Sequence, residues 1–358
     1  MRTVFVIGAG ANVEIGLPSG NELKMKIAEL LDFFWHGREM TKGDDLIYSA
    51  IVQYLKENNK YVNEEVRKIC DIARNISKAM PLSISIDNFI DAHRGNQQVE
   101  LCGKLAIVRA ILEEEHNCPL YDIFDKNFPQ RINQRKVEQL NKSWYPLLFQ
   151  KITEGCIIDE LAVRLNDISF IIFNYDRCFE YYMYNTLMDY YNINHNRAKE
   201  IVQRLHVNHP YGTVGDLWEN NSNLSFGKRP DSTLLLQLAQ KIKTFTETER
   251  IDQEKDSSKG IQYLVERADR IIFLGFAYHD QNLELLFKPP GTWKKIDDVS
   301  FSNAVTCYGT GYGIIADELQ HLCGTIRVRD GRIKTIDISD VTCSKFFHDF
   351  SYRLSFKK

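Results

Sequence analysis

The sequence predicts an α/β protein with a Rossmann-like, doubly wound parallel sheet and a helical insertion. Three observations predict this fold class. Residues 3–7 form a continuous β-branched and aromatic run, which is typical of a strand buried on both faces. A glycine-containing turn and a predicted helix follow it, and strand, turn and helix open a nucleotide-binding βα unit. Similar apolar runs return after residue 166, each ending in a loop with Gly, Asn, Asp or His.

The first unit is predicted to contain a strand at residues 3–7 and then a helix at residues 22–34. Ser19 or Asn21 is expected to cap this helix, because both side chains can accept hydrogen bonds from first-turn amides. Apolar residues at helical spacing replace strand-like runs between residues 40 and 165.

We therefore expect a helical insertion at residues 40–165. It divides one nucleotide-binding domain into two parts, residues 1–39 and 166–358. The second part is predicted to alternate strands with loops or helices. Its predicted elements are a strand at 168–176, a helix from Cys178 to about Tyr191, a short strand within 204–215, strand-then-loop segments at 268–280 and 303–311, and a strand then a helix from Ile333.

Composition excludes several classes of function. The 358 residues carry 45 Lys and Arg against 48 Asp and Glu, a net charge of -3, so bulk charge does not attract nucleic acid. No window approaches 18 consecutive apolar residues, so we expect no membrane span and a cytoplasmic protein. Eight scattered Cys form no C-x-x-C pair, and we therefore expect no metal site.

The first candidate site is the turn G-A-G-A-N at residues 8–12, followed by G-L-P at residues 16–18. Gly8 and Gly10 permit a tight turn and let backbone N–H groups approach a pyrophosphate. A dinucleotide dehydrogenase would instead place a third Gly at position 13, which is Val here.

Two further candidates follow predicted strands. Asn174 and Asp176 lie in F-N-Y-D at the end of the most hydrophobic run, where the alternative is an Asx turn and helix cap. His209 and His206 lie in H-V-N-H-P-Y-G. We favour His209 as a general base because it is predicted in the loop, while His206 is predicted in the strand. A hydrogen-bonded structural imidazole is the alternative for each.

These motifs together resemble sirtuin-like proteins. That family carries G-A-G-x-S and then G-[IL]-P, an N-x-D signature, and a late glycine segment similar to F-L-G-F-A-Y-H-D-Q-N at residues 273–282. S-I-D-N-F-I at residues 85–90 also resembles a recurrent family element, to which we assign no chemistry. The family has a catalytic His immediately before a Gly, whereas Tyr211 precedes Gly212 here. Because the zinc-ribbon C-x-x-C pairs of deacylating sirtuins are missing, the chain is more similar to zinc-free members in prokaryotic anti-phage systems.

The resemblance implies that NAD is a substrate and that the nicotinamide–ribose bond is cleaved by water without a metal. It implies that Asn174 orients the ribose or the water, that Asp176 belongs to the nicotinamide pocket and that His209 is the base. The implied NAD-binding residues are Gly8, Ala9, Gly10, Asn12, Pro18, Asp176, Gly275, Asp280 and Asn282.

The resemblance also implies a homo-oligomer that depletes NAD during phage infection, with a motor ATPase of the HerA type as a credible partner. Two other functions stay open. One is an NAD-dependent deacylase or ADP-ribosyl transferase, and the other is a catalytically silent sensor that binds NAD or ADP-ribose.

Overall fold

A computed structural model describes residues 1–124, 133–218, 224–248, 260–287 and 304–356. Within these ranges, a parallel sheet has the strand order β5-β4-β1-β6-β7-β8. Numbered along the chain, these strands have the order 3-2-1-4-5-6 of a doubly wound Rossmann sheet, so the predicted fold class is confirmed. The strands are β1 (Thr3–Ile7), β4 (Ile168–Ile172), β5 (His206–Asn208), β6 (Arg270–Leu274), β7 (Val305–Thr310) and β8 (Ile333–Ser339).

The three central strands are fully buried, as their apolar sequences predict. Every residue of β1, β4 and β6 is buried. Side chains alternate between the two faces, so Val4 and Val6 join one hydrophobic cluster while Phe5 and Ile7 join the other. Phe5 stacks on Phe170 of β4 at 5.3 Å between ring centroids. The sheet therefore has a core on each face.

Helices cover both faces of the sheet. One hydrophobic cluster joins the sheet to α15 (Ile261–Glu266), α16 (Asp280–Leu286) and α17 (Ala316–Arg329). The opposite cluster contains side chains from α7 (Pro119–Phe124), α8 (Gln134–Lys142), α9 (Trp144–Thr153), α10 (Ile158–Leu165), α11 (Cys178–Tyr191), α12 (His195–Arg204) and α18 (Cys343–Asp349). The short α1 (Ala9–Asn12) and the 3₁₀ turn η1 (Val13–Ile15) follow β1.

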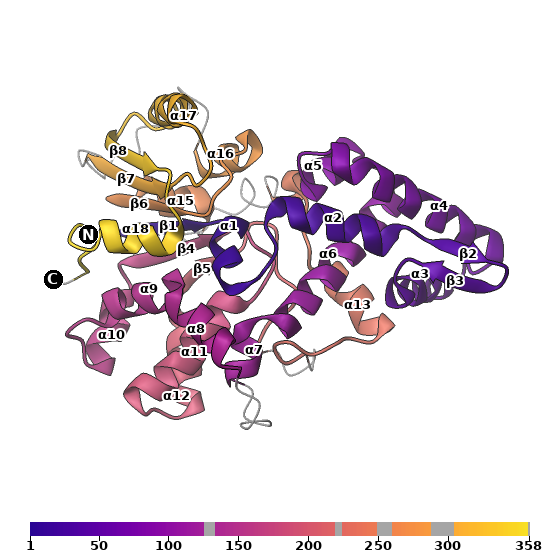
Figure 1. Cartoon of the computed structure of the whole chain (residues 1–358), viewed down its shortest axis with the longest axis horizontal. Helices are drawn as coiled ribbons and strands as arrows, with labels where there is room; N and C mark the ends of the chain where they lie inside the picture. The colour runs from indigo at the N-terminus through magenta and orange to yellow at the C-terminus, as the bar shows by residue number, and fades with distance from the viewer. Residues whose placement is uncertain (125–132, 219–223, 249–259, 288–303, 357–358) are drawn as a thin grey trace.

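A second group of helices extends away from the sheet in Figure 1, and we call it the helical lobe. Its helices pack on one another, and α13 packs on α3 and α6 although it comes much later in the chain. The lobe consists of α2 (Gly20–Leu31), the hairpin β2 (Phe34–His36) and β3 (Glu39–Lys42), α3 (Asp45–Glu57), α4 (Asn63–Ala79), η2 (Met80–Leu82), α5 (Ile86–Ala92), α6 (Gln97–Asn117) and α13 (Ser232–Ala239). Helices from residues 40–165 thus lie in two places, α3–α6 in the lobe and α7–α10 beside the sheet.

The first predicted helix begins as expected and ends early. Ser19 caps α2 in a capping box, in which its hydroxyl accepts from the Glu22 amide at 3.3 Å and the Glu22 carboxylate accepts from the Ser19 amide at 2.8 Å. The helix ends at Leu31, and residues 34–36 pair with β3 instead. The prediction to residue 34 is therefore wrong at its end, because Asp32 leaves the helical conformation with a ψ of 62°, and the chain then turns back at Gly37, whose φ is 63°.

The second half of the chain follows the predicted order of elements. Helix α11 begins at Cys178 and ends at Tyr191, as predicted. The predicted strand at 168–176 is shorter, because β4 ends at Ile172 and leaves residues 173–176 in a loop. Within the described ranges, no helix has the length and apolarity needed to cross a membrane.

Candidate functional site

The candidate site lies at the carboxyl edge of the central strands. Ile7 of β1 is level with Ile172 of β4 on one side and with Leu274 of β6 on the other. The loops that begin at residues 8, 173 and 275 therefore leave the sheet side by side. Strand order reverses between β1 and β6, and ligands of doubly wound sheets bind at such a switch point.

The glycines of the first and last motifs bring two of these loops into contact. The Gly8 amide donates to Leu274 O and the Gly10 amide donates to Gly275 O, each at 3.0 Å. A Cβ added to Gly8 would lie 2.6 Å from Gly275 O, and one added to Gly275, whose φ is 54°, would lie 1.8 Å from the Ala11 nitrogen. The N–H groups of Gly8 and Gly10 thus bond protein carbonyls, and the predicted contact of this turn with a pyrophosphate stays a prediction. The glycines serve close packing of β1 and β6 loops.

Asn12 and Asp176 are predicted site residues that the fold brings together across 164 positions of sequence. The Asn12 amide donates to both carboxylate oxygens of Asp176, at 3.0 and 2.9 Å, and the Tyr145 hydroxyl donates to Asn12 Oδ1 at 2.9 Å. Burial raises the pKa of Asp176 above its ordinary value, although hydrogen bonds from Cys178 and Asn12 oppose the shift. Tyr145 lies on α9, and no sequence motif marks it as a site residue.

Asn174 lies one residue beyond the start of the loop after β4 and is only 6% exposed. Neither its side-chain nitrogen nor its oxygen has a hydrogen-bond partner among the described residues. A buried polar group left unpaired costs about 1–3 kcal/mol, so such groups need an explanation in a native structure. An amide that is buried, unpaired and placed at a ligand-binding edge is well suited to hold a substrate or a water molecule.

His209 does not have the free ring nitrogen that its predicted role as base requires. Its Nδ1 donates to the backbone oxygen of Asn174 at 3.0 Å, and its Nε2 contacts Glu180 Oε1 at 2.8 Å. Burial lowers the pKa of His209, but the Glu180 carboxylate and the hydrogen bonds outweigh burial and raise the pKa overall. The imidazolium form therefore donates from both nitrogens, which favours the structural alternative over general-base chemistry. His206 lies in β5, as expected.

A buried ion pair fixes the segment after Asp176. Arg177 Nε and Nη2 donate to the two carboxylate oxygens of Glu115 at 3.1 and 2.5 Å, and its Nη1 donates to Leu224 O at 2.9 Å. Both partners are nearly inaccessible, with side chains 2% and 0% exposed. Bidentate contact of this kind constrains orientation as well as distance. Glu115 lies on α6, so the lobe and the site loop are joined here.

A second link between lobe and site comes from the string at residues 85–90. Asp87 of α5 accepts a hydrogen bond from the Tyr175 hydroxyl, and Asn88 donates to Gln281 at 3.4 Å. Burial raises the pKa of Asp87 to about 6, with the Tyr175 hydrogen bond opposing it. No chemistry was predicted for residues 85–90 from the sequence. The structure places its carboxyl group against the middle residue of N-Y-D.

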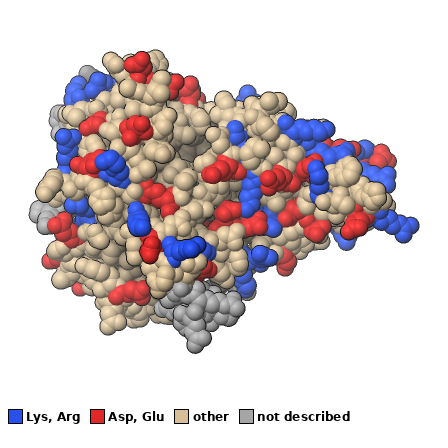
Figure 2. All heavy atoms as spheres, viewed as in Figure 1, with Lys and Arg blue, Asp and Glu red and all other residues tan. Residues whose placement is uncertain are grey.

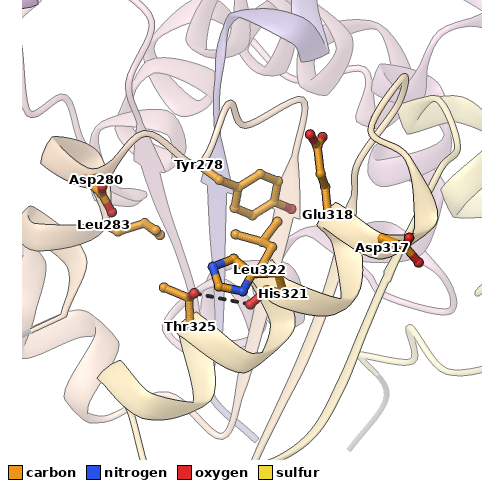
Figure 3. A pocket seen from close by; sticks show the side chains of 8 residues that line it. All are labelled: Tyr278, Asp280, Leu283, Asp317, Glu318, His321, Leu322 and Thr325. Carbon is orange, nitrogen blue, oxygen red and sulfur yellow. Dashed lines mark hydrogen bonds between the residues drawn. The ribbon is translucent and has the colours of Figure 1, made fainter.

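The predicted ribose contacts Asp280 and Asn282 face different surroundings. Asn282 accepts from the Tyr211 hydroxyl at 2.7 Å. Asp280 is exposed and pairs with Arg329 at 3.0 Å. Asp280 also lies at one side of an open depression of about 440 Å³, with Asp317 and Glu318 across from it in Figure 3. Its lining residues are Tyr278, Asp280, Leu283, Asp317, Glu318, His321, Leu322 and Thr325. Neither predicted residue caps α16, whose N-cap is His279.

The remaining predicted residues are Ala9 and Pro18. Both are half-buried; Ala9 is the first residue of α1, and Pro18 follows η1. Figure 2 shows basic and acidic side chains interspersed over the face in view. In the part of the chain that the structure describes, no group of three or more His, Cys, Asp or Glu is arranged to hold a metal ion. Comparison with protein-family models, curated proteins and solved structures finds no match to this chain.

Proposed function

We propose that this protein hydrolyses NAD⁺ to nicotinamide and ADP-ribose. The observation that carries the proposal is the unpaired, buried amide of Asn174 at the carboxyl end of β4. A doubly wound sheet with this strand order binds ligands at that edge, close to the reversal between β1 and β6. The ligand class comes from the resemblance of the sequence motifs to sirtuin-like proteins. Three residues of those motifs, Asn12, Asn174 and Asp176, lie at this edge of the sheet.

Cleavage of NAD⁺ requires the protein mainly to orient the ribose and the water and to stabilise the developing positive charge. The nicotinamide of NAD⁺ is already cationic, so the C–N bond breaks when the ribose can develop positive charge and water can reach C1′. Asn174 orients the ribose or the water, while Asp176, held by Asn12, contributes negative potential in a site largely closed to solvent. The three glycines shape the edge through backbone packing.

The deciding experiment identifies the products. Purified protein is incubated with NAD⁺, and nicotinamide and ADP-ribose are measured by mass spectrometry, with and without an acetyl-lysine peptide. We expect equal amounts of the two products and no effect of the peptide. A product pattern that changes with the peptide would contradict hydrolysis and support transfer to an acceptor.

A second candidate is an NAD or ADP-ribose sensor without catalysis. The occupied ring nitrogens of His209 favour it, because a histidine base needs a free nitrogen. Calorimetry separates the candidates. Saturable NAD⁺ binding with no nicotinamide release, at any protein concentration, would support the sensor and contradict the hydrolase.

We also propose a cytoplasmic role in anti-phage defence, in which a homo-oligomer, with a HerA-type ATPase as partner, depletes NAD. This part rests on the resemblance of the motifs alone. Its test is phage challenge of cells carrying the chain, with NAD measured during infection. Unchanged NAD in infected cells that resist the phage would contradict it.

A further inference from the structure

We propose that Glu180 is the general base of the site, and that His209 is a positioning residue that holds it. The inference rests on the proposed NAD⁺ hydrolysis and changes which side chain accepts the proton. Its basis is the distribution of unpaired polar atoms. Among the described residues, the buried side-chain atoms without a hydrogen-bond partner are Asn174 Nδ2, Asn174 Oδ1 and Glu180 Oε2.

These three atoms belong to two residues that His209 bridges. Its ring donates through Nδ1 to the backbone of Asn174 and through Nε2 to Glu180 Oε1. One carboxylate oxygen of Glu180 is therefore fixed in place, and the other is left to accept a proton. Unpaired buried groups are costly, and two on one bridged pair indicate a polar molecule that belongs between them.

Glu180 lies in the first turn of α11, where the helix dipole favours negative charge. Its side chain is 18% exposed although Oε2 itself is buried, so water can reach the residue. Charged or titratable groups around it include His209, Arg177, Asp176 and Tyr145.

The proposed step needs only NAD⁺, water and the carboxylate of Glu180. Water held by Asn174 loses a proton to Glu180 Oε2 as its oxygen bonds to C1′ of the nicotinamide ribose. The C1′–N bond breaks, and its electron pair neutralises the pyridinium ring, which leaves as nicotinamide. Glu180 then releases the proton to solvent. A carboxylate is a sufficient base here, because the attacked carbon is already electron-poor in the transition state.

The test compares Glu180→Gln, Glu180→Ala and His209→Gln with wild type, measuring NAD⁺ affinity by calorimetry and nicotinamide release. Glu180→Gln keeps the shape and a hydrogen bond to His209 but cannot accept the proton. We expect a loss in turnover of about a hundred- to ten-thousandfold, with NAD⁺ affinity retained. His209→Gln should lose less, since the carboxylate remains. Glu284→Gln, an exposed glutamate on α16, is the matched control and should turn over normally.

Formate gives a readout that a merely structural role would not move. Added formate should restore part of the turnover of Glu180→Ala, because a small carboxylate can enter the space left by the side chain, and it should not raise that of wild type. A Glu180→Gln variant as active as the wild type would overturn the assignment of Glu180 as the base, without contradicting the proposed NAD⁺ hydrolysis. So would an inactive His209→Gln beside a Glu180→Ala that formate does not rescue. A wild type that binds NAD⁺ and releases no nicotinamide would overturn the proposed function, and this inference with it.

Discussion

At the residue scale, the site contains pairs of side chains that are hydrogen-bonded to one another and also polar groups that have no hydrogen-bond partner among the described residues. Asn12 and Asp176 are hydrogen-bonded to one another, as are Arg177 and Glu115, so both pairs hold the loop after β4 in place. Asn174 lies within that rigid loop with its amide unpaired. Rigid surroundings are what keep a costly unpaired group in place, and the cost is recovered when a ligand bonds to it.

Replacing Asn174 should therefore separate activity from stability. We expect Asn174→Ala to reduce NAD⁺ cleavage about a hundred- to a thousandfold, as loss of a preorganised polar group commonly does. Its free energy of unfolding should not fall, since no protein hydrogen bond is lost and a buried amide without a partner is removed. Asn185→Ala is the matched control, because Asn185 is also buried but donates to Tyr181 O at 2.8 Å. That variant should lose about 1 kcal/mol of stability and keep its turnover. Equal activity of Asn174→Ala and wild type would remove Asn174 from the mechanism.

Asp87 gives a pH dependence with a definite sign. Burial raises its pKa from 3.8 to about 6, so the native state prefers the protonated carboxyl. This contribution to stability is fully present below about pH 4 and is lost as pH rises through 6. Asp87→Asn cannot ionise. We expect its unfolding free energy, relative to wild type, to rise between pH 4.5 and 7.5 by at most about 3 kcal/mol in urea titrations. A difference that is constant with pH would contradict the burial of this carboxyl group.

At the scale of elements, the strands were the most predictable part of the molecule. Residues 4–7 and 271–274 are apolar runs of the kind expected for strands buried on both faces, and that property is visible in the sequence alone. The hairpin of β2 and β3 was not predicted, since Phe34 and Trp35 continue the apolar pattern of α2 and only the turn geometry ends the helix. The local apolar pattern therefore predicts the strands, whereas the end of α2 depends on backbone geometry that this pattern does not show.

The site was predictable only in part, for a related reason. Asn174 and Asp176 follow a recognisable strand, so their position at its end is correct. The ion pair of His209 with Glu180 joins two ordinary-looking residues 29 positions apart, and no local pattern marks it. The glycine motif was recognised, but its contact with another loop 267 residues away was not, because no local pattern marks it.

Two glycines on different elements make the role of close packing testable. Gly275→Ala forces a residue with a Cβ into a φ of 54° and against the Ala11 nitrogen, so we expect a loss of more than about 3 kcal/mol or failure to fold. Gly324→Ala lies within α17 with open space around its Cα, and should gain about 0.5–1 kcal/mol. Thermal unfolding measures both. A stable Gly275→Ala would show that the two loops separate easily.

At the scale of the whole molecule, the helical lobe and the site are mechanically joined. Asp87 of α5 and Glu115 of α6 contact Tyr175 and Arg177, which flank Asp176. A displacement of the lobe would therefore reach the loop that carries Asn174. An NAD hydrolase that is always active would exhaust the NAD of its own cell. We therefore expect assembly through the lobe to control the activity, by favouring one conformation of the site loop.

We expect turnover per molecule to rise with protein concentration until a homo-oligomer, measured by light scattering, is fully formed. Phe34 of the hairpin is 50% exposed and offers an apolar contact on the lobe. Phe34→Glu should weaken assembly about tenfold or more and lower turnover in parallel. Tyr352→Glu is the control, since Tyr352 is 98% exposed at the other end of the chain. A fully active monomer with concentration-independent turnover would show that assembly does not regulate the activity.

The central position of β1 has a consequence for synthesis on the ribosome. Among the strands of this sheet, β1 is made before both of its neighbours, β4 on one side and β6, which begins at residue 270, on the other. At about 5–20 residues per second, roughly 13–53 s pass between the synthesis of β1 and that of β6. During that interval an apolar, extended segment waits without its partners, while helices of the lobe can already collapse on one another through local contacts. Slower translation between residues 7 and 270 would therefore prolong the time during which the apolar side chains of β1 are without the strand that covers one of its edges.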